Sequence, residues 1–252
     1  MFQQADAYET FMGRYSRSLA PEFARAAGVA EGQHVLDVGC GTGALTAVLA
    51  ELVGADQVAA VDPSEPFVEE CQASVPGADV RVAPAEALPF ENGTFDRALS
   101  QLVFHFVQDP AASVREMARV TRPGGLLAAC VWDMTGGMSM LRGYWQSVRE
   151  AGIPGGDEAE RFGGHEGQLA TLWREAGLHD VTDGSLTIES RYRDFDELWD
   201  SFQGGVGPAG AHASALEGEA REAVREAFRR NVGSPEGEFA LSARAWYAAG
   251  TV

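Results

Sequence analysis

The stretch 34–43, HVLDVGCGTG, decides the fold of this 252-residue chain. Residues 35–38 form a short apolar run that is typical of a buried strand, and glycines follow at 39, 41 and 43. Apolar residues then recur at helical spacing over 45–52. In α/β proteins, a strand, a glycine turn and a helix in this order bring backbone N–H groups against a nucleotide-like ligand. Glycines suit this turn because they have no side chain to block that approach.

The spacing of the glycines narrows the kind of ligand. Gly41 and Gly43 are two residues apart, whereas the dinucleotide fingerprint G-x-G-x-x-G places its last two glycines three apart. All 19 basic residues are arginines, so the chain has no Walker lysine and no lysine for Schiff-base chemistry. A phosphate-binding P-loop is therefore excluded, and an NAD(P)-dependent oxidoreductase is disfavoured.

A carboxylate follows at the expected distance from the glycine turn. The predicted strand 57–61 ends in Asp62, and Pro63 opens the next predicted helix. A carboxylate about 20 residues beyond such a turn is placed to accept both ribose hydroxyls of a nucleotide. The alternative is that Asp62 only begins a turn before Pro63.

Three further segments follow in order. The predicted strand 79–83 leads into PAEALPF at 84–90. The predicted strand 95–101 ends in the polar Gln101, and LVFHFVQDP with His105 comes next. The residues RPGG at 122–125 predict a sharp turn, and the apolar run 126–131 suits a strand in the middle of a parallel sheet.

VLDVGCGTG resembles the first motif of the class I methyltransferases that depend on S-adenosylmethionine (SAM), and the later segments follow in that family's order over residues 34–133. The likeness is to the small-molecule methyltransferases of the ubiquinone/menaquinone-biosynthesis type. It implies an α/β fold, a three-layer Rossmann-like sandwich. Its seven-stranded sheet would be mostly parallel, with order 3-2-1-4-5-7-6, an antiparallel last strand and helical cap insertions.

The resemblance also implies a SAM site. Its predicted cosubstrate residues are Asp37, Gly39, Cys40, Gly41, Asp62, Pro63, Ala85, Glu86 and Gln101. Ala85 would offer its backbone N–H to the adenine ring. The chain departs from the family pattern at Pro84, where relatives often carry an aspartate, because proline supplies neither a carboxylate nor an N–H. This contact is therefore absent or comes from elsewhere.

His105 occupies the first histidine position of a segment that commonly reads L-H-H in related enzymes, and Phe106 occupies the second. His105 is the candidate general base, because the ordinary pKa of histidine lies near neutrality. The alternative is a positioning or packing residue at the start of a helix.

The stretch 7–23, AYETFMGRYSRSLAPEF, resembles the segment that folds over the cosubstrate in related small-molecule methyltransferases. We expect a helical lid over 1–30, in which Arg14 meets the methionine carboxylate and Tyr15, or Tyr8, borders the pocket. The alternative is a surface helix that packs Phe11 and Leu19 inward.

The remaining pattern predicts a single domain over 1–252. Its SAM-binding core spans 31–133, cap insertions span 134–164 and 194–235, and 165–193 and 236–252 complete the core. We expect a strand over 181–192, with a bulge at Gly184. Trp132, Tyr144, Trp145 and Trp199 are the predicted aromatic lining of a substrate pocket, although each suits the hydrophobic side of a cap helix equally well.

Composition limits the partners. A net charge of −18 without a basic cluster argues against nucleic acids and anionic membrane surfaces. Cys40, Cys71 and Cys130 are odd in number and widely spaced, so neither a disulfide framework nor a metal site is expected. No signal peptide or membrane-spanning run is apparent, which predicts a cytoplasmic protein. We also expect a monomer or a homodimer.

The sequence therefore predicts a SAM-dependent methyltransferase that transfers a methyl group to a small hydrophobic or aromatic molecule by in-line displacement. S-adenosylhomocysteine (SAH) would be its second product. A SAM-binding protein without methyl transfer, a cyclase or a regulatory protein, is the main alternative, since its site would contain the same residues.

Overall fold

The computed structural model describes residues 8–156 and 162–252. Its centre is a seven-stranded sheet with the order β3-β2-β1-β4-β5-β7-β6, and only β7 runs antiparallel to its neighbours. The predicted fold class and strand order are confirmed. The strands are β1 (Val35–Val38), β2 (Val58–Asp62), β3 (Asp79–Val82), β4 (Phe95–Gln101), β5 (Thr121–Trp132), β6 (His179–Tyr192) and β7 (Phe239–Thr251).

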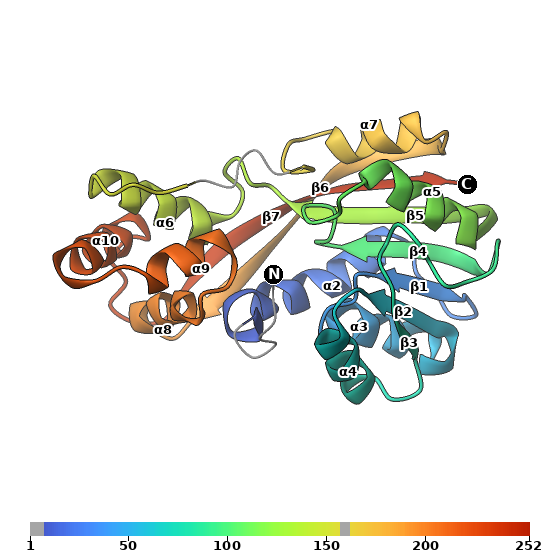
Figure 1. The fold of residues 1–252 in the computed structure, drawn as a ribbon, viewed down its shortest axis with the longest axis horizontal. Helices are drawn as coiled ribbons and strands as arrows, with labels where there is room; N and C mark the ends of the chain where they lie inside the picture. Colours follow the sequence, from blue (N-terminus) through green and yellow to red (C-terminus); the bar gives the residue numbers. More distant parts are fainter. Residues whose placement is uncertain (1–7, 157–161) are drawn as a thin grey trace.

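Helices cover both faces of the sheet (Figure 1). On one face, α5 packs on β4 and β5, and α7 packs on β6 and β7; on the other lie α2, α3 and α4. The helices are η1 (Glu9–Gly13), α2 (Arg14–Ala26), α3 (Ala44–Val53), η2 (Ala55–Gln57), α4 (Glu65–Ser74), α5 (Pro110–Val120), α6 (Ser139–Glu150), α7 (Gln168–Glu175), α8 (Phe195–Ser201), η3 (Phe202–Gly204), α9 (Gly207–Ser214) and α10 (Gly218–Asn231).

Alternation along the strands divides the core into two layers. In β1, Val35 packs with α2 and α3, whereas Leu36 and Val38 pack with the layer that holds α5 and α7. All residues of β1 and β2 are buried, as expected for central parallel strands with helices on both faces.

The helices α6, α8, α9 and α10 lie together at one end of the molecule, where β6 and β7 extend beyond the other strands (Figure 1). They come from the two predicted cap segments, and α6 packs against α10. The cap segment 134–164 includes residues 157–161, which lie outside the described part of the chain. The cap shares the core layer of α2 and α3, through residues such as Phe11 and Phe202.

The predicted bulge at Gly184 is wrong. Gly184 pairs in register with Tyr247, and the register shift lies between His179 and Thr182 instead. Asp180 has a φ of +48° there, a left-handed conformation that aspartate tolerates better than most residues. Glycine is typical of a break in a strand, but here the pairing is irregular at Asp180, where an aspartate adopts the left-handed conformation.

The residues RPGG form an irregularity within β5. Thr121 pairs with Phe95 and Leu126 pairs with Arg97, so the four residues 122–125 lie opposite Asp96 alone. Gly124 has a φ of +76° in this turn. In the described ranges 8–156 and 162–252, no helix is both long and apolar enough to cross a bilayer.

Candidate functional site

A cavity of about 750 Å³ lies at the carboxyl ends of β1, β2, β4 and β5. Its volume falls within the range of about 300–1,000 Å³ that small-molecule sites occupy. Its wall is formed by the glycine turn, the end of each of these strands, the N-terminal segment and the start of α9. The lining residues are Tyr8, Phe11, Met12, Gly39, Gly41, Asp62, Pro63, Ser64, Phe67, Gln101, Leu102, Val103, His105, Phe106, Trp132, Met134, Leu141, Gly204, Gly205, Val206, Gly207, Pro208 and Ala211.

The glycine turn forms the cavity wall after β1. Gly39 has a φ of +80°, and a Cβ placed on it would lie 2.3 Å from a methyl group of Val103, so a larger residue would clash with the protein itself. Gly41 has a φ of +54°, and a Cβ placed on it would meet no protein atom within 4 Å. A glycine is therefore needed at 39 for packing against Val103, whereas the glycine at 41 leaves its backbone accessible from the cavity.

Asp62 is the last residue of β2, and its side chain contacts this turn. One carboxylate oxygen accepts the backbone N–H of Gly41 at 3.0 Å, and the other accepts that of Ser64 at 2.9 Å. Burial raises the pKa of Asp62 above its ordinary value, and these two hydrogen bonds act in the opposite direction. Since a carboxylate has about four lone-pair sites, Asp62 retains acceptor capacity toward the cavity.

Asp37 lies beneath the turn and is fully buried. The Thr46 hydroxyl donates to one of its oxygens at 2.7 Å, and among the described residues no hydrogen-bond partner reaches the other oxygen. Burial raises the pKa of Asp37 to about 7, although the bond from Thr46 lowers it. Asp37 does not line the cavity, so it can affect ligand binding only indirectly, by holding the glycine turn in place.

This raised pKa predicts a pH-dependent stability. Between about pH 4 and about pH 7 the folded chain holds a proton on Asp37 that the unfolded chain has released, so this group's contribution to stability falls as pH rises through that window. We expect Asp37→Asn to show a smaller fall in Tm than the wild type when both are melted without ligand at about pH 5 and about pH 8. Parallel Tm changes in the two proteins would contradict a protonated Asp37.

Gln101 and His105 stand where β4 ends. The Gln101 amide donates to the backbone oxygen of Ser16 at 3.1 Å, and its buried Oε1 has no hydrogen-bond partner among the described residues. His105 Nδ1 lies 2.8 Å from the backbone oxygen of Phe162. Because a carbonyl only accepts, Nδ1 carries the proton, and in the neutral ring Nε2 is then the basic nitrogen.

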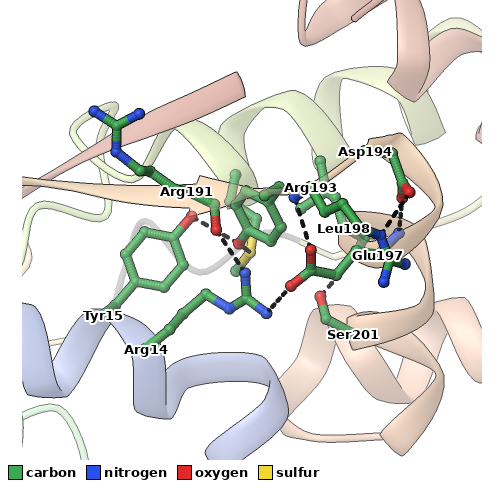
Figure 2. Close-up of polar contacts among 10 residues, drawn as sticks. Arg14, Tyr15, Arg191, Arg193, Asp194, Glu197, Leu198 and Ser201 are labelled. Carbon is green, nitrogen blue, oxygen red and sulfur yellow. Dashed lines mark hydrogen bonds and ion pairs between the residues drawn. The ribbon is translucent and has the colours of Figure 1, made fainter. Parts of the chain in front are cut away.

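Arg14 does not reach the cavity, contrary to expectation. Its guanidinium donates to the backbone oxygen of Arg191 at 2.9 Å and to the Glu197 carboxylate at 2.6 Å, and it stacks on the Tyr192 ring (Figure 2). The backbone N–H of Arg193 and the Arg14 guanidinium hold the pKa of Glu197 below its ordinary value. Arg14 thus joins the predicted lid to β6 and α8.

Tyr15 is also absent from the cavity wall. It is fully buried, and its hydroxyl lies 2.9 Å from that of Tyr192 (Figure 2). Tyr8, which lies seven residues earlier on the same segment, borders the cavity instead. The helical segment presents Tyr8, Phe11 and Met12 to the cavity, while the next turns pack on β6.

The Arg14–Glu197 pair should stabilise the fold modestly. Both side chains are partly exposed, so we expect Arg14→Ala to lower the free energy of unfolding by about 0.5–1 kcal/mol in urea titrations. Arg25→Ala is the matched control on the same helix, because Arg25 pairs with Glu22 at the surface and should change stability by less. Equal losses would show that Arg14 does not join the lid to α8 in solution.

Three more predicted cosubstrate residues are not among the residues that line the cavity. Cys40 is buried within the turn, between the lining residues Gly39 and Gly41. Ala85 is buried in the core layer of α5. Glu86 accepts the backbone N–H of Gln108 at 3.0 Å, just before α5. The predicted backbone contact of Ala85 with adenine stays a prediction.

Of the four predicted aromatic pocket residues, Trp132 alone lines the cavity. Tyr144 stacks on Phe202, and its hydroxyl lies 2.7 Å from His212 Nδ1. Trp145 and Trp199 are buried with it in the interior of the cap. The apolar face of α6 is buried and packs chiefly on α10 and its neighbours, while Leu141 at its start lines the cavity.

Sequence reasoning missed much of the apolar wall. Phe11 and Met12 follow Tyr8 at helical spacing, a signal that could have placed all three on one face. The segment 204–208, GGVGP, also lines the cavity, but it carries no periodicity that would have assigned it. Phe106, which replaces the second histidine of the family pattern, lies in the wall and is 39% exposed.

Comparison with known proteins agrees with this architecture. The methyltransferase domain family matches residues 36–129. An uncharacterized protein of Mycobacterium bovis is 32% identical over 197 residues, which are 76% of this chain and 70% of that protein. An uncharacterized methyltransferase of the same organism is 40% identical over 104 residues, 41% of each chain.

A putative methyltransferase from Bacillus halodurans shares the fold, with a TM-score of 0.59 at 16% identity over 92% of this chain and 99% of that one. The domain match begins in β1 and ends in β5, so it includes the glycine turn after β1 and Gln101 at the end of β4. Together with the strand order, these matches show that the chain belongs to the class I, Rossmann-like SAM-dependent methyltransferases.

Proposed function

We propose that this protein transfers the methyl group of SAM to a small, uncharged, hydrophobic or aromatic acceptor within the cavity. One observation carries the proposal: a single cavity joins the glycine turn and Asp62 to a broad apolar wall. The first part suits a nucleoside and the second suits an apolar molecule, so donor and acceptor would meet in one space.

The donor end of the cavity fits SAM in its chemistry. Asp62 would accept the ribose hydroxyls, and the bare backbone at Gly41 would let the nucleoside approach. The buried Oε1 of Gln101 has no hydrogen-bond partner among the described residues, and a donor such as the ammonium of the methionine part would satisfy it. Arg14 is engaged with Glu197, so it is not the partner that we propose for the methionine carboxylate.

The acceptor end is apolar. Trp132, Met134 and Leu141 line it from the side of β5 and α6, and Phe11 and Val206 line it from the lid and the cap. Among the lining residues that the structure describes, Asp62, which we assign to the ribose, is the one Asp, Glu or Arg side chain. A charged acceptor would lose its hydration without gaining an ionic partner, whereas an uncharged one would bury apolar surface favourably.

SAM supplies a methyl group already activated by its cationic sulfur, so the protein's task is to orient the acceptor, exclude water and handle a proton. The apolar wall orients and desolvates the acceptor, which brings the nucleophile into near-attack geometry. His105 is the candidate base for an acceptor that must lose a proton, because the Phe162 carbonyl holds the ring with Nε2 as its basic nitrogen.

The remaining expectations are part of the same proposal. The absence of a basic cluster in the sequence supports an acceptor that is a small molecule and not a nucleic acid or a membrane surface. We also propose a cytoplasmic protein that acts as a monomer or homodimer without a metal ion.

The proposal is tested by incubating the full chain with SAM and a panel of uncharged aromatic and aliphatic acceptors. Mass spectrometry then measures SAH together with the methylated product. We expect SAH to form in step with a methylated acceptor. SAM binding without SAH from any acceptor would favour a SAM-binding protein, and binding of NADH in place of SAM would favour an oxidoreductase.

A further inference from the structure

Two cysteines that the proposed reaction does not use lie together at the glycine turn. Cys40 is in the turn after β1, and Cys71 is in α4, 31 residues later. They belong to one small buried cluster, separate from the two main core layers, and each thiol shifts the pKa of the other. A Cβ placed on Gly43 would lie 3.1 Å from the Cys71 sulfur, so the turn packs directly on this thiol.

Cys71 is linked through Thr46 to the buried Asp37. The Cys71 sulfur lies 3.6 Å from the Thr46 hydroxyl, which donates to Asp37 at 2.7 Å. The hydrogen bond from Cys40 lowers the pKa of Cys71 below the ordinary thiol value, while that of Cys40 is raised. Cys71 is therefore the better nucleophile of the two, with a second thiol in contact with it.

The two buried thiols lie next to residues that line the cavity. Gly39 and Gly41, the neighbours of Cys40 on both sides, line the cavity, and so does Phe67, one turn before Cys71 on α4. Cys130, near the carboxyl end of β5, is the matched comparison within the same protein, because it belongs to another core cluster and has neither of the other two cysteines in that cluster.

We propose that Cys40 and Cys71 form a redox-active thiol pair, oxidised by a peroxide to an intramolecular disulfide that weakens cosubstrate binding. The Cys71 thiolate attacks one peroxide oxygen, giving a sulfenic acid and hydroxide. The Cys40 thiol then attacks the sulfenic sulfur, the S–S bond forms, and water leaves. In total the two thiols lose two electrons, and these reduce one molecule of hydrogen peroxide to two molecules of water.

The disulfide would act on the cosubstrate site because it joins two parts of that site. A bond of about 2.05 Å holds sulfurs much closer than a hydrogen bond does, so the turn and α4 must shift toward each other. The hydrogen bonds from Gly39 and Cys40 to Val61, and from Gly41 to Asp62, fix the turn at present. Displacing the turn changes the surface that faces the nucleoside. This effect on binding rests on the proposed SAM site, whereas disulfide formation does not.

The test treats the full chain with hydrogen peroxide and measures intact mass, the position of the disulfide by peptide mapping, and SAM affinity by calorimetry. We expect loss of the mass of two hydrogen atoms, a Cys40–Cys71 linkage with Cys130 still reduced, and SAM binding weaker by about tenfold or more. A dithiol reductant should restore the affinity, and SAM present during treatment should slow the oxidation because it fills the cavity.

Cys71→Ser and Cys71→Ala serve as matched controls. Both should keep their SAM affinity after the same treatment, and two variants guard against a folding defect in either one. The proposal is overturned if no Cys40–Cys71 disulfide forms, if the linkage involves Cys130 or a second chain, or if the disulfide leaves SAM affinity unchanged. Reduced protein that binds no SAM would instead refute the proposed function, since the mass measurement still decides whether the disulfide forms.

Discussion

Asp62→Ala is expected to weaken SAM binding about 100-fold, measured by calorimetry on the reduced protein. Hydrogen bonds to a charged group contribute about 1.5–3 kcal/mol in net terms, and about 1.4 kcal/mol corresponds to each tenfold in affinity. Asp62 has two functions in this account: it would accept the ribose hydroxyls, and it already holds the backbone of Gly41 and Ser64. Both are lost in the alanine variant.

Two variants separate these functions from a general loss of structure. Asp62→Asn keeps one acceptor oxygen and should fall between the wild type and the alanine variant. Asp56→Ala, a change of the same kind at an exposed position in η2, should leave the affinity unchanged. A thermal melt confirms folding in each case. An alanine variant that is folded and binds SAM within about threefold of wild type would remove Asp62 from the site.

His105→Asn is expected to lower kcat by a factor of about 10² or more, since general base catalysis typically contributes 10²–10⁴-fold. The asparagine amide can still donate to the Phe162 carbonyl, as Nδ1 does, but it offers no basic nitrogen in place of Nε2. SAM affinity should therefore stay close to wild type. The acidic limb of the kcat–pH profile, which reports protonation of the base, should disappear.

His165→Asn is the control, because His165 is exposed and outside the cavity wall. The reaction is measured with the acceptor that gives methylated product in the proposed assay. If His105→Asn retains wild-type kcat, the acceptor needs no base from this residue. If kcat and SAM affinity fall together, His105 is a positioning residue for the end of β4.

The parallel core was predictable because each of its signals is local in sequence. A buried strand followed by a glycine turn needs only the residues 35–43, and Asp62 and Gln101 are polar residues at the ends of apolar strands. Since carboxyl ends of parallel strands meet at one edge, their side chains had to converge. The structure places Gly39, Gly41, Asp62, Gln101 and His105 in one cavity wall, as that argument requires.

The cap was not predictable to the same degree, because its contacts join segments far apart in the chain. The apolar face of α6 could meet either the cavity or another helix, and the spacing of Tyr144 and Trp145 is the same in both cases. The choice depends on α10, more than 70 residues later in the chain, which packs on α6. Similarly, Arg14 is held by Glu197, a partner 183 residues away that no local pattern reveals.

A crystal structure of the protein with bound SAH would test the central claim most directly. We expect SAH in the cavity of about 750 Å³, with its ribose hydroxyls on Asp62, its nucleoside against Gly41, and its sulfur on the side of Gln101, His105 and Trp132. SAH bound elsewhere, or in the cavity with Asp62 facing away from the ribose, would contradict the assignment of this cavity as the methyl-transfer site.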